Sequence, residues 1–172
     1  QDKRLFLSPP HMSGAEKGFL DEVFATNFIA PAGPLIERFE RDFCDLTGIA
    51  HACALNSGTA AIHLALRVLG VGRGDEVWMP SLTFIGGVSP VSYLGASPVF
   101  LDSAADSWGV DIELLEVELR RAKQTGTLPT ALISVDLYGQ PVDQDKINEI
   151  CTSHGVPVIS DSAEAMGNPP LW

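Results

Sequence analysis

The segment that decides the fold is LNSGTAAIHLAL, at residues 55–66. Residues 52–55 form a short apolar run that predicts a strand, and residues 60–69 are rich in apolar helix formers. Because this helix is apolar on nearly every side, we expect it to be buried. Its first N–H groups lack partners within the helix, and Gly58 has no side chain that would keep an anion away. Ser57 and Thr59 add hydroxyl donors. The junction is therefore a candidate phosphate site, and the alternative is that Ser57 or Thr59 only caps a core helix.

A unit of short apolar strand, turn and helix recurs along the rest of the chain. Such alternation predicts an α/β fold with a mostly parallel sheet and flanking helices. In open α/β sheets, ligands bind beyond the carboxyl ends of the strands, so the residues directly after each strand are candidates for a site. The predicted strands are 52–55, 76–79, 98–101, 131–135 and 157–160, and the predicted helices are 60–69, 83–94, one from Asp111 and one from Asp143. The candidate segments are 56–59, 80–84, Asp102, 136–139 and 161–164.

Two helices joined by a loop are expected before this repeat begins. Ser13 and Glu16 have the spacing of a capping box, which predicts a helix that ends near Asn27. The loop at residues 28–34 contains two prolines and a glycine. Its apolar Phe28 needs a surface on which to pack, either within its own domain, in a pocket or at a subunit contact. The second helix is expected to end at Gly48.

The composition is that of a globular protein. Of 172 residues, 45% are hydrophobic and 19% are charged, and the formal net charge is −11. An acidic surface repels nucleic acid and anionic lipid, so we expect neither as a partner. The sequence shows no signal peptide and no spanning apolar run, which favours a cytoplasmic protein. Cys44, Cys53 and Cys151 match no disulfide or metal framework and are expected to be buried reduced thiols, and no metal site is expected.

Asp161 follows the last predicted strand, where its carboxylate would be partly buried. A buried carboxylate needs a cation or several hydrogen-bond donors, and no Lys or Arg lies near Asp161 in the sequence. A ligand with a protonated ring nitrogen would meet this need, and Glu164 could bind a second atom of that ligand. The alternative is that Asp161 caps the following turn. A dinucleotide site is not supported, because the glycine-rich residues 70–74 follow a helix and precede a strand.

Five segments, in order, resemble the pyridoxal-phosphate-dependent nucleotide-sugar aminotransferases of the DegT/DnrJ/EryC/StrS type. The resemblance covers the chain up to Gly167. It implies a cytoplasmic protein that contains the N-terminal portion, residues 1–172, of the large domain of a fold-type-I transferase, dimeric when intact. The opening residues 7–12 and 27–31 are most similar to enzymes that aminate UDP-4-keto-6-deoxy-N-acetylhexosamines, with glutamate as the amino donor. The five segments are 56–61, 80–84, 94–102, 137–141 and 161–167.

The resemblance also implies a role for individual residues. Gly58 and Thr59, with Ser57 beside them, would hold the phosphate of pyridoxal 5′-phosphate, and Phe84 would stack on its ring. Asp161 would pair with the protonated pyridine nitrogen, and Glu164 would lie near the ring hydroxyl. Asn27 and Phe28 would approach the nucleotide sugar. These six cofactor residues and two substrate residues form the candidate site.

The chain departs from the family in one respect. The lysine that forms the Schiff base in these enzymes follows the segment at 161–164 by some distance, and this sequence ends at Trp172. No lysine of the chain follows the cofactor segments, and the small domain is not represented. We therefore expect the chain to lack catalytic activity on its own. The alternatives to an aminotransferase portion are a non-catalytic α/β fragment that binds pyridoxal phosphate or another phosphate ligand, and a Rossmann-like oxidoreductase, which would need the missing dinucleotide fingerprint.

Overall fold

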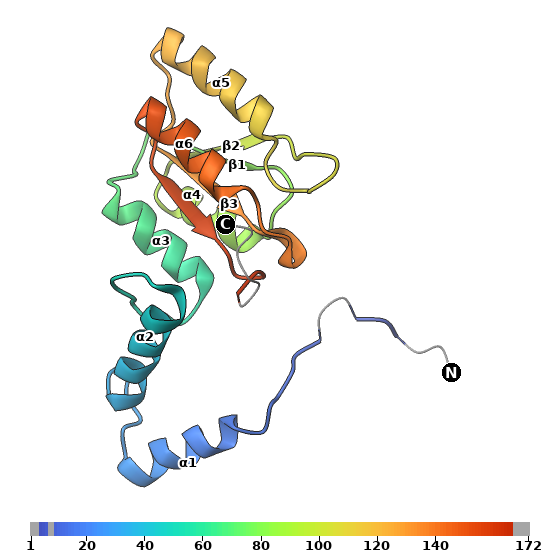
Figure 1. Cartoon of the computed structure of the whole chain (residues 1–172). Coiled ribbons are helices and arrows are strands. Elements are labelled where there is room, and N and C mark those ends of the chain that lie inside the picture. The colour runs from blue at the N-terminus through green and yellow to red at the C-terminus, as the bar shows by residue number, and fades with distance from the viewer. Residues whose placement is uncertain (1–3, 7–8, 167–172) are drawn as a thin grey trace. The chain divides into compact units, whose positions relative to one another are not determined.

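Figure 1 shows the computed structural model of the chain, which describes residues 4–6 and 9–166. The chain forms two compact units, residues 1–54 and residues 55–172. None of the described helices is long and apolar enough to cross a membrane. The elements are, in chain order, α1 (Glu16–Thr26), α2 (Pro34–Thr47), α3 (Gly58–Val68), β1 (Glu76–Pro80), α4 (Ile85–Tyr93), β2 (Ser97–Leu101), α5 (Ile112–Thr125), β3 (Ala131–Val135), the 3-10 helix η1 (Leu137–Gly139), α6 (Gln144–His154) and β4 (Val158–Asp161).

The first unit consists of α1 and α2, and no described residue in it is buried. The Glu16 carboxylate accepts a hydrogen bond from the backbone N–H of Ser13 at 2.8 Å, as in a capping box. This bond is the main reason why the pKa of Glu16 is lowered to about 2. The helix begins at Glu16 with Ala15 as its N-cap, however, so the prediction that Ser13 caps it is wrong. Asn27 ends α1 and Gly48 ends α2, both in the left-handed conformation, as the sequence predicted.

The second unit is built on a fully parallel sheet with the strand order β2-β1-β3-β4. The chain leaves β1 toward β2 on one side and continues from β3 toward β4 on the other side. The direction of winding therefore changes between β1 and β3. In open α/β sheets the crevice at the carboxyl ends of two such strands is the usual ligand site. The predicted α/β class with a parallel sheet is confirmed.

Helices cover both faces of this sheet, as Figure 1 shows. Trp78 and Leu132 pack with α5 and α6 in one core, whereas Val77, Ala131 and Ile133 pack with α3 and α4 in the other. Neighbouring residues of one strand enter different cores because side chains alternate across a pleated sheet. All five residues of β3 are buried, as is typical of a parallel strand with helices on both sides.

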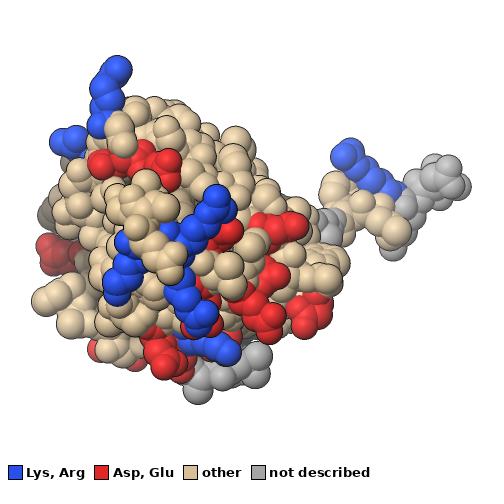
Figure 2. All heavy atoms as spheres, turned by 90° about the horizontal axis from the view of Figure 1, so that it is seen from above, with Lys and Arg blue, Asp and Glu red and all other residues tan. Residues whose placement is uncertain are grey.

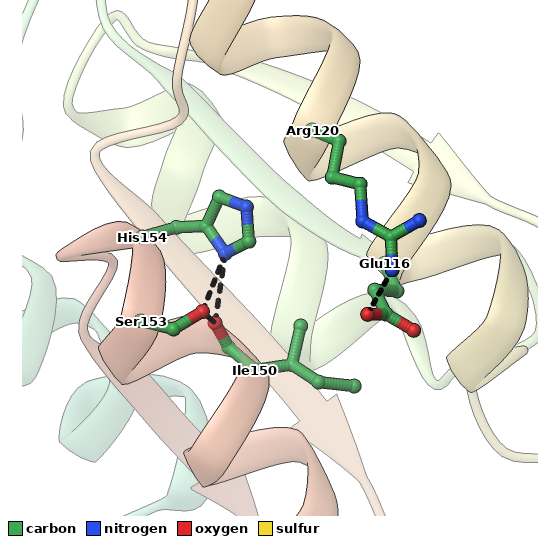
Figure 3. Close-up of polar contacts among 5 residues, drawn as sticks. All are labelled: Glu116, Arg120, Ile150, Ser153 and His154. Carbon is green, nitrogen blue, oxygen red and sulfur yellow. Dashed lines mark hydrogen bonds and ion pairs between the residues drawn. The ribbon is translucent and has the colours of Figure 1, made fainter.

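Figure 3 shows polar contacts within α5 and within α6. On α6, Nδ1 of His154 lies 2.9 Å from the carbonyl oxygen of Ile150 and 2.9 Å from Oγ of Ser153. On α5, Arg120 pairs with Glu116 one turn away, a type of surface pair that contributes little to stability. Figure 2 views the molecule from above relative to Figure 1. On the face that it shows, basic side chains lie among acidic ones.

Residues 52–55 do not form the predicted strand. The backbone N–H of Ala54 donates to the Glu40 carboxylate at 2.8 Å instead of to a neighbouring strand. Alanine also has a low preference for strands, so the short apolar run had little to hold it in a sheet. The helix α3 therefore follows a loop, and the expected strand-to-helix junction is a loop-to-helix junction.

Two predictions of burial are also wrong. Only Ile62 and Leu66 of α3 are buried, whereas Leu64 and Val68 are exposed, because the sheet and α4 cover only one side of this helix. Among the cysteines, Cys151 is buried, Cys44 is partly exposed and Cys53 is exposed. Cys53 is exposed because it lies in the loop that replaces the expected strand. Burial raises the pKa of the Cys151 thiol to about 11, which keeps it in the neutral form.

Two side-chain truncations on α5, one buried and one exposed, should differ clearly in their effect on the free energy of unfolding. Leu119 is 0% exposed, whereas Val117 on the same helix is 54% exposed. We expect Leu119→Ala to lower the free energy of unfolding by about 2 to 5 kcal/mol, because it leaves a cavity in the core. Val117→Ala should change it by less than about 1 kcal/mol. Urea unfolding followed by circular dichroism measures both, and equal midpoints for the two variants would contradict the assigned core.

Candidate functional site

The residues expected to bind phosphate lie at the N-terminus of α3. The backbone at Ser57 is extended, and Ser57 Oγ accepts a hydrogen bond from the backbone N–H of Ala60 at 3.2 Å. Ser57 is therefore the N-cap of α3, as one of the two sequence interpretations held. The N–H groups of Gly58 and Thr59 belong to the first helical turn, which has no acceptor within the helix. A Cβ atom at Gly58 would meet no atom within 4 Å apart from its chain neighbours, so the space beside this residue is open.

Two glycines of α4 bring the rest of the site together. A Cβ atom at Gly86 would lie 2.8 Å from Thr59 Oγ1 and 2.9 Å from the Phe84 ring. A Cβ atom at Gly87 would lie 3.5 Å from a carboxylate oxygen of Asp161. The start of α4 thus lies between the phosphate residues and the acid at the end of β4. Any side chain at Gly86 would have to displace its neighbours.

Phe84 directly precedes α4 and is 72% exposed. One edge of its ring lies beside Gly86, and most of the side chain is exposed. A large apolar ring in this position is available to stack on a flat ligand. The sequence placed this aromatic after a strand, and the structure places it beside Thr59.

Asp161 ends β4, and its side chain is partly buried. Burial raises the pKa of its carboxyl group, and the like charges of Asp136 and Glu164 raise it further. The backbone N–H of Ala163 opposes this effect, with a long hydrogen bond of 3.4 Å to Asp161 Oδ1. The ion pairs among the described residues lie on α1, α2 and α5, so none of them neutralises this acid. The site holds negative charge that has no counter-ion within the described part of the chain.

Glu164 is exposed, and its carboxylate accepts a hydrogen bond from the backbone N–H of Tyr138. Tyr138 lies in η1 with a φ of 54°, in the left-handed region, which is uncommon for a residue other than glycine. The Tyr138 ring meets Trp108 edge to face, with 5.8 Å between ring centroids. Sequence reasoning gave neither aromatic residue a role, and the left-handed backbone at Tyr138 leaves no local sequence signal.

Asp136 is a second acid, which the sequence placed in the candidate segment 136–139 without a specific role. It follows β3 and is only 8% exposed, and both of its carboxylate oxygens accept hydrogen bonds. Its position directly after a strand was the one available signal. Among the residues that the structure describes, no group of three or more His, Cys, Asp or Glu side chains is arranged to hold a metal ion.

Asn27 and Phe28 belong to the first unit, whereas the other candidate residues belong to the second unit. Phe28 is 52% exposed and, with Ile29, lines a cavity of about 250 Å³ between the end of α1 and the start of α2. Phe28 therefore packs partly within its own unit and lines a pocket. The structure thus brings together Thr59, Phe84 and Asp161 in the second unit, and it describes Asn27 and Phe28 separately.

Curated relatives are similar along nearly the whole of this chain. The "Putative pyridoxal phosphate-dependent aminotransferase EpsN" of Bacillus subtilis (strain 168) is 49% identical over 165 residues, which are 96% of this chain and 42% of that protein. The GDP-perosamine synthase of Caulobacter vibrioides is 39% identical over 164 residues, covering 95% of this chain and 43% of that protein. The chain therefore spans less than half the length of the curated relatives it matches.

A solved structure of similar fold is DesV from S. venezuelae. It has a TM-score of 0.75 and 35% sequence identity, over 90% of this chain and 42% of that chain. The fold is that of fold-type-I pyridoxal-phosphate-dependent aminotransferases. The model of the DegT/DnrJ/EryC1/StrS aminotransferase family matches residues 10–169, and the chain belongs to this family.

The environment of Asp161 predicts that an amide stabilises the ligand-free protein. A folded-state pKa above the unfolded value means that this group contributes stability at low pH, which is lost as the pH rises through the folded-state pKa. Asp161→Asn avoids that loss. We expect a higher urea midpoint than the parent at about pH 8 and a difference that shrinks toward about pH 4. Glu149→Gln, at an exposed carboxylate on α6, is the control and should unfold as the parent does. A lower midpoint for Asp161→Asn at both pH values would contradict the interpretation.

Proposed function

We propose that the second unit binds pyridoxal 5′-phosphate, and that the whole protein transfers an amino group to a nucleotide-linked keto sugar. Membership of the aminotransferase family supports this proposal, as do the names of the Bacillus and Caulobacter relatives. Because the chain spans less than half of each relative, the activity is proposed for a longer protein that contains these residues.

The N-terminus of α3 fits the phosphate group. The N–H groups of Gly58 and Thr59 point out of the first helical turn, and the helix dipole places partial positive charge there. The open space at Gly58 lets a phosphate approach the backbone closely. Ser57 adds a hydroxyl group beside them. Thr59 and Ser57 would then orient the phosphate and, through it, the whole cofactor.

The other three residues fit the cofactor ring. Phe84 would stack on one face of the ring and keep water from it, since its own ring is largely exposed in the chain alone. Asp161 would hold the proton on the pyridine nitrogen. Glu164 would accept a hydrogen bond near the ring hydroxyl while one of its oxygens stays bound to the Tyr138 N–H. The cofactor itself, when bound, supplies the electron sink for the carbanion chemistry.

The observation that carries this proposal is the unpaired charge at Asp161. A partly buried carboxylate beside two other acids is unfavourable in the free protein, and a pyridinium ring would supply the missing positive charge. The proposed ligand therefore accounts for an acid in this unfavourable position. On binding, the positive ring would lower this pKa again and keep Asp161 ionised.

We propose that the substrate is a UDP-4-keto-6-deoxy-N-acetylhexosamine and that glutamate is the amino donor. The proposed contacts to the sugar nucleotide are Asn27 and Phe28, where Phe28 lines an apolar cavity of the first unit. We also propose that the intact protein is a homodimer. The lysine that binds the cofactor covalently is expected outside the 172 residues, so these residues alone would bind the cofactor without turnover.

Amination by the full-length protein that contains this chain tests the proposal. With pyridoxal phosphate, glutamate and a UDP-4-keto-6-deoxy-N-acetylhexosamine, we expect an amino-sugar product that mass spectrometry detects. Asp161→Asn should lower turnover by at least about 100-fold, because an amide cannot offset the ring charge. Near-normal turnover of Asp161→Asn would contradict the assignment. Binding without product in the full-length protein would favour the non-catalytic alternative, and product from the 172 residues alone would contradict the expected position of the lysine.

The phosphate site has a separate test in Gly58→Val. A branched side chain there would block the first N–H groups of α3 without a clash in the free protein, because nothing lies within 4 Å. We expect at least about tenfold weaker binding of pyridoxal phosphate, measured by titration, with an unchanged circular dichroism spectrum. Gly18→Val is the matched control, since Gly18 lies in the first turn of α1 and also has open space around it. Equal affinity of Gly58→Val and the parent would place the phosphate elsewhere.

A further inference from the structure

Asp136 is the one buried carboxylate among the described residues. A carboxylate in such a place is costly unless donors satisfy it, and no described Lys or Arg pairs with it. The proposed cofactor contacts do not include Asp136. Its burial therefore calls for a role that the site residues named so far do not provide.

The hydrogen bonds of Asp136 join three segments of the second unit. Its Oδ1 accepts from the backbone N–H of Val142 at 2.9 Å, on the segment that leads into α6. Its Oδ2 accepts from Ser162 Oγ at 2.6 Å, on the turn after β4. Its own backbone N–H donates to the carbonyl oxygen of Asp161 at 3.0 Å. Two of these three bonds end on the pair of residues that begins the turn at 161–164.

A second connection links the same two segments. The backbone N–H of Tyr138, two residues after Asp136, donates to the Glu164 carboxylate. The turn at 161–164 is thus bound at Asp161, Ser162 and Glu164 to the segment 136–138. The two acids proposed for the cofactor ring stand on this turn, one at each end. A hydrogen-bonded network of this kind fixes side-chain positions to within a fraction of an ångström when each member is satisfied.

Charged groups near the turn lie on several elements, and among them Asp143, the N-cap of α6, follows the Val142 that donates to Asp136. Asp161 and Glu164 are acids of the turn, and Asp136 is the acid bound to it; the adjoining Thr83, before α4, and Gly87, in α4, are uncharged. The helix α3 packs against β4 and carries His63 and Arg67. The His63 ring faces Tyr93, and Arg67 lies in the last turn of α3, at the far end from the phosphate residues. Asp136 is thus held by hydrogen bonds, and no ion pair among the described residues involves it.

We propose that Asp136 is a positioning residue that, through Ser162, holds the turn at 161–164 in the geometry in which Asp161 and Glu164 meet the cofactor ring. This inference rests on the proposed function. Asp136 acts through the turn and touches no ring atom. Its negative charge also lies beside Asp161, where it adds to the attraction for a positive ring.

Removal of the Ser162 hydroxyl tests this inference in the full-length protein that contains the chain. The probe is pyridoxamine 5′-phosphate, which needs no covalent link, and its bound ring is titrated by absorbance. We expect Ser162→Ala to bind the probe about tenfold more weakly and to lower the pH at which the bound ring loses its proton by about one unit. Asp136→Ala should do at least as much. Ser162→Thr keeps the hydroxyl on an exposed residue and should restore the parent values.

Ser134→Ala is the matched control. Ser134 is fully buried in β3, and its hydroxyl donates to Gln144 Oε1 on α6 at 2.8 Å and not to the turn. It should lower the urea midpoint and leave both probe measurements unchanged. The inference fails if Ser162→Ala and Asp136→Ala match the parent, or if Ser134→Ala shifts the ring titration as much as they do. A parent that does not bind the probe overturns the proposed function, and this inference with it.

Discussion

The register between β3 and β4 is the constraint on which the site depends. Val135 lies opposite Asp161 in this parallel pair, so the residues that follow, Asp136 and Ser162, come side by side beyond the sheet. Their side chains then meet at 2.6 Å. A slip of one residue would turn each side chain of one strand to the other face of the sheet and separate them. The burial of β3 on both faces fixes this register, because a shifted strand would place its side chains in the wrong core. The same strand register therefore sets both the packing of the sheet and the positions of the acids.

The acids at this edge are unfavourable for the free protein. Asp161 is partly buried near Asp136 and Glu164, and its burial, with the like charges of these two acids, raises its pKa. Proteins keep such groups where a ligand or a reaction uses them, and they lose some stability as a result. Here the backbone N–H of Ala163 and the hydroxyl of Ser162 meet part of the need for donors, on different carboxylates. The remainder is what a cationic ring would supply.

The start of α4 shows how a locally weak helix serves the same edge. Gly86, Gly87 and Pro90 lower its helix propensity, yet the helix forms over Ile85–Tyr93. Tertiary packing outweighs this preference, since Gly86, Gly87 and Pro90 are all buried. The glycines also allow the backbone to pass close to Thr59 Oγ1 and the Phe84 ring, where a side chain would collide. Local sequence and global fold disagree at this helix, and such disagreement is common at functional sites.

The sequence by itself determined the alternation of strands and helices, the bounds of β3 at 131–135 and the residues at which α1 and α2 end. These features depend on side-chain period and on neighbours within a few residues, which a sequence records directly. Only the tertiary structure decided the strand order, the lack of a strand at 52–55, the exposure of half of α3, and the contacts of Asp136 and Tyr138. The hydrogen bonds from Ser162 to Asp136 and from Tyr138 to Glu164 each join residues 26 positions apart. Their formation depends on which strands pair and in which register, and no local pattern carries that information.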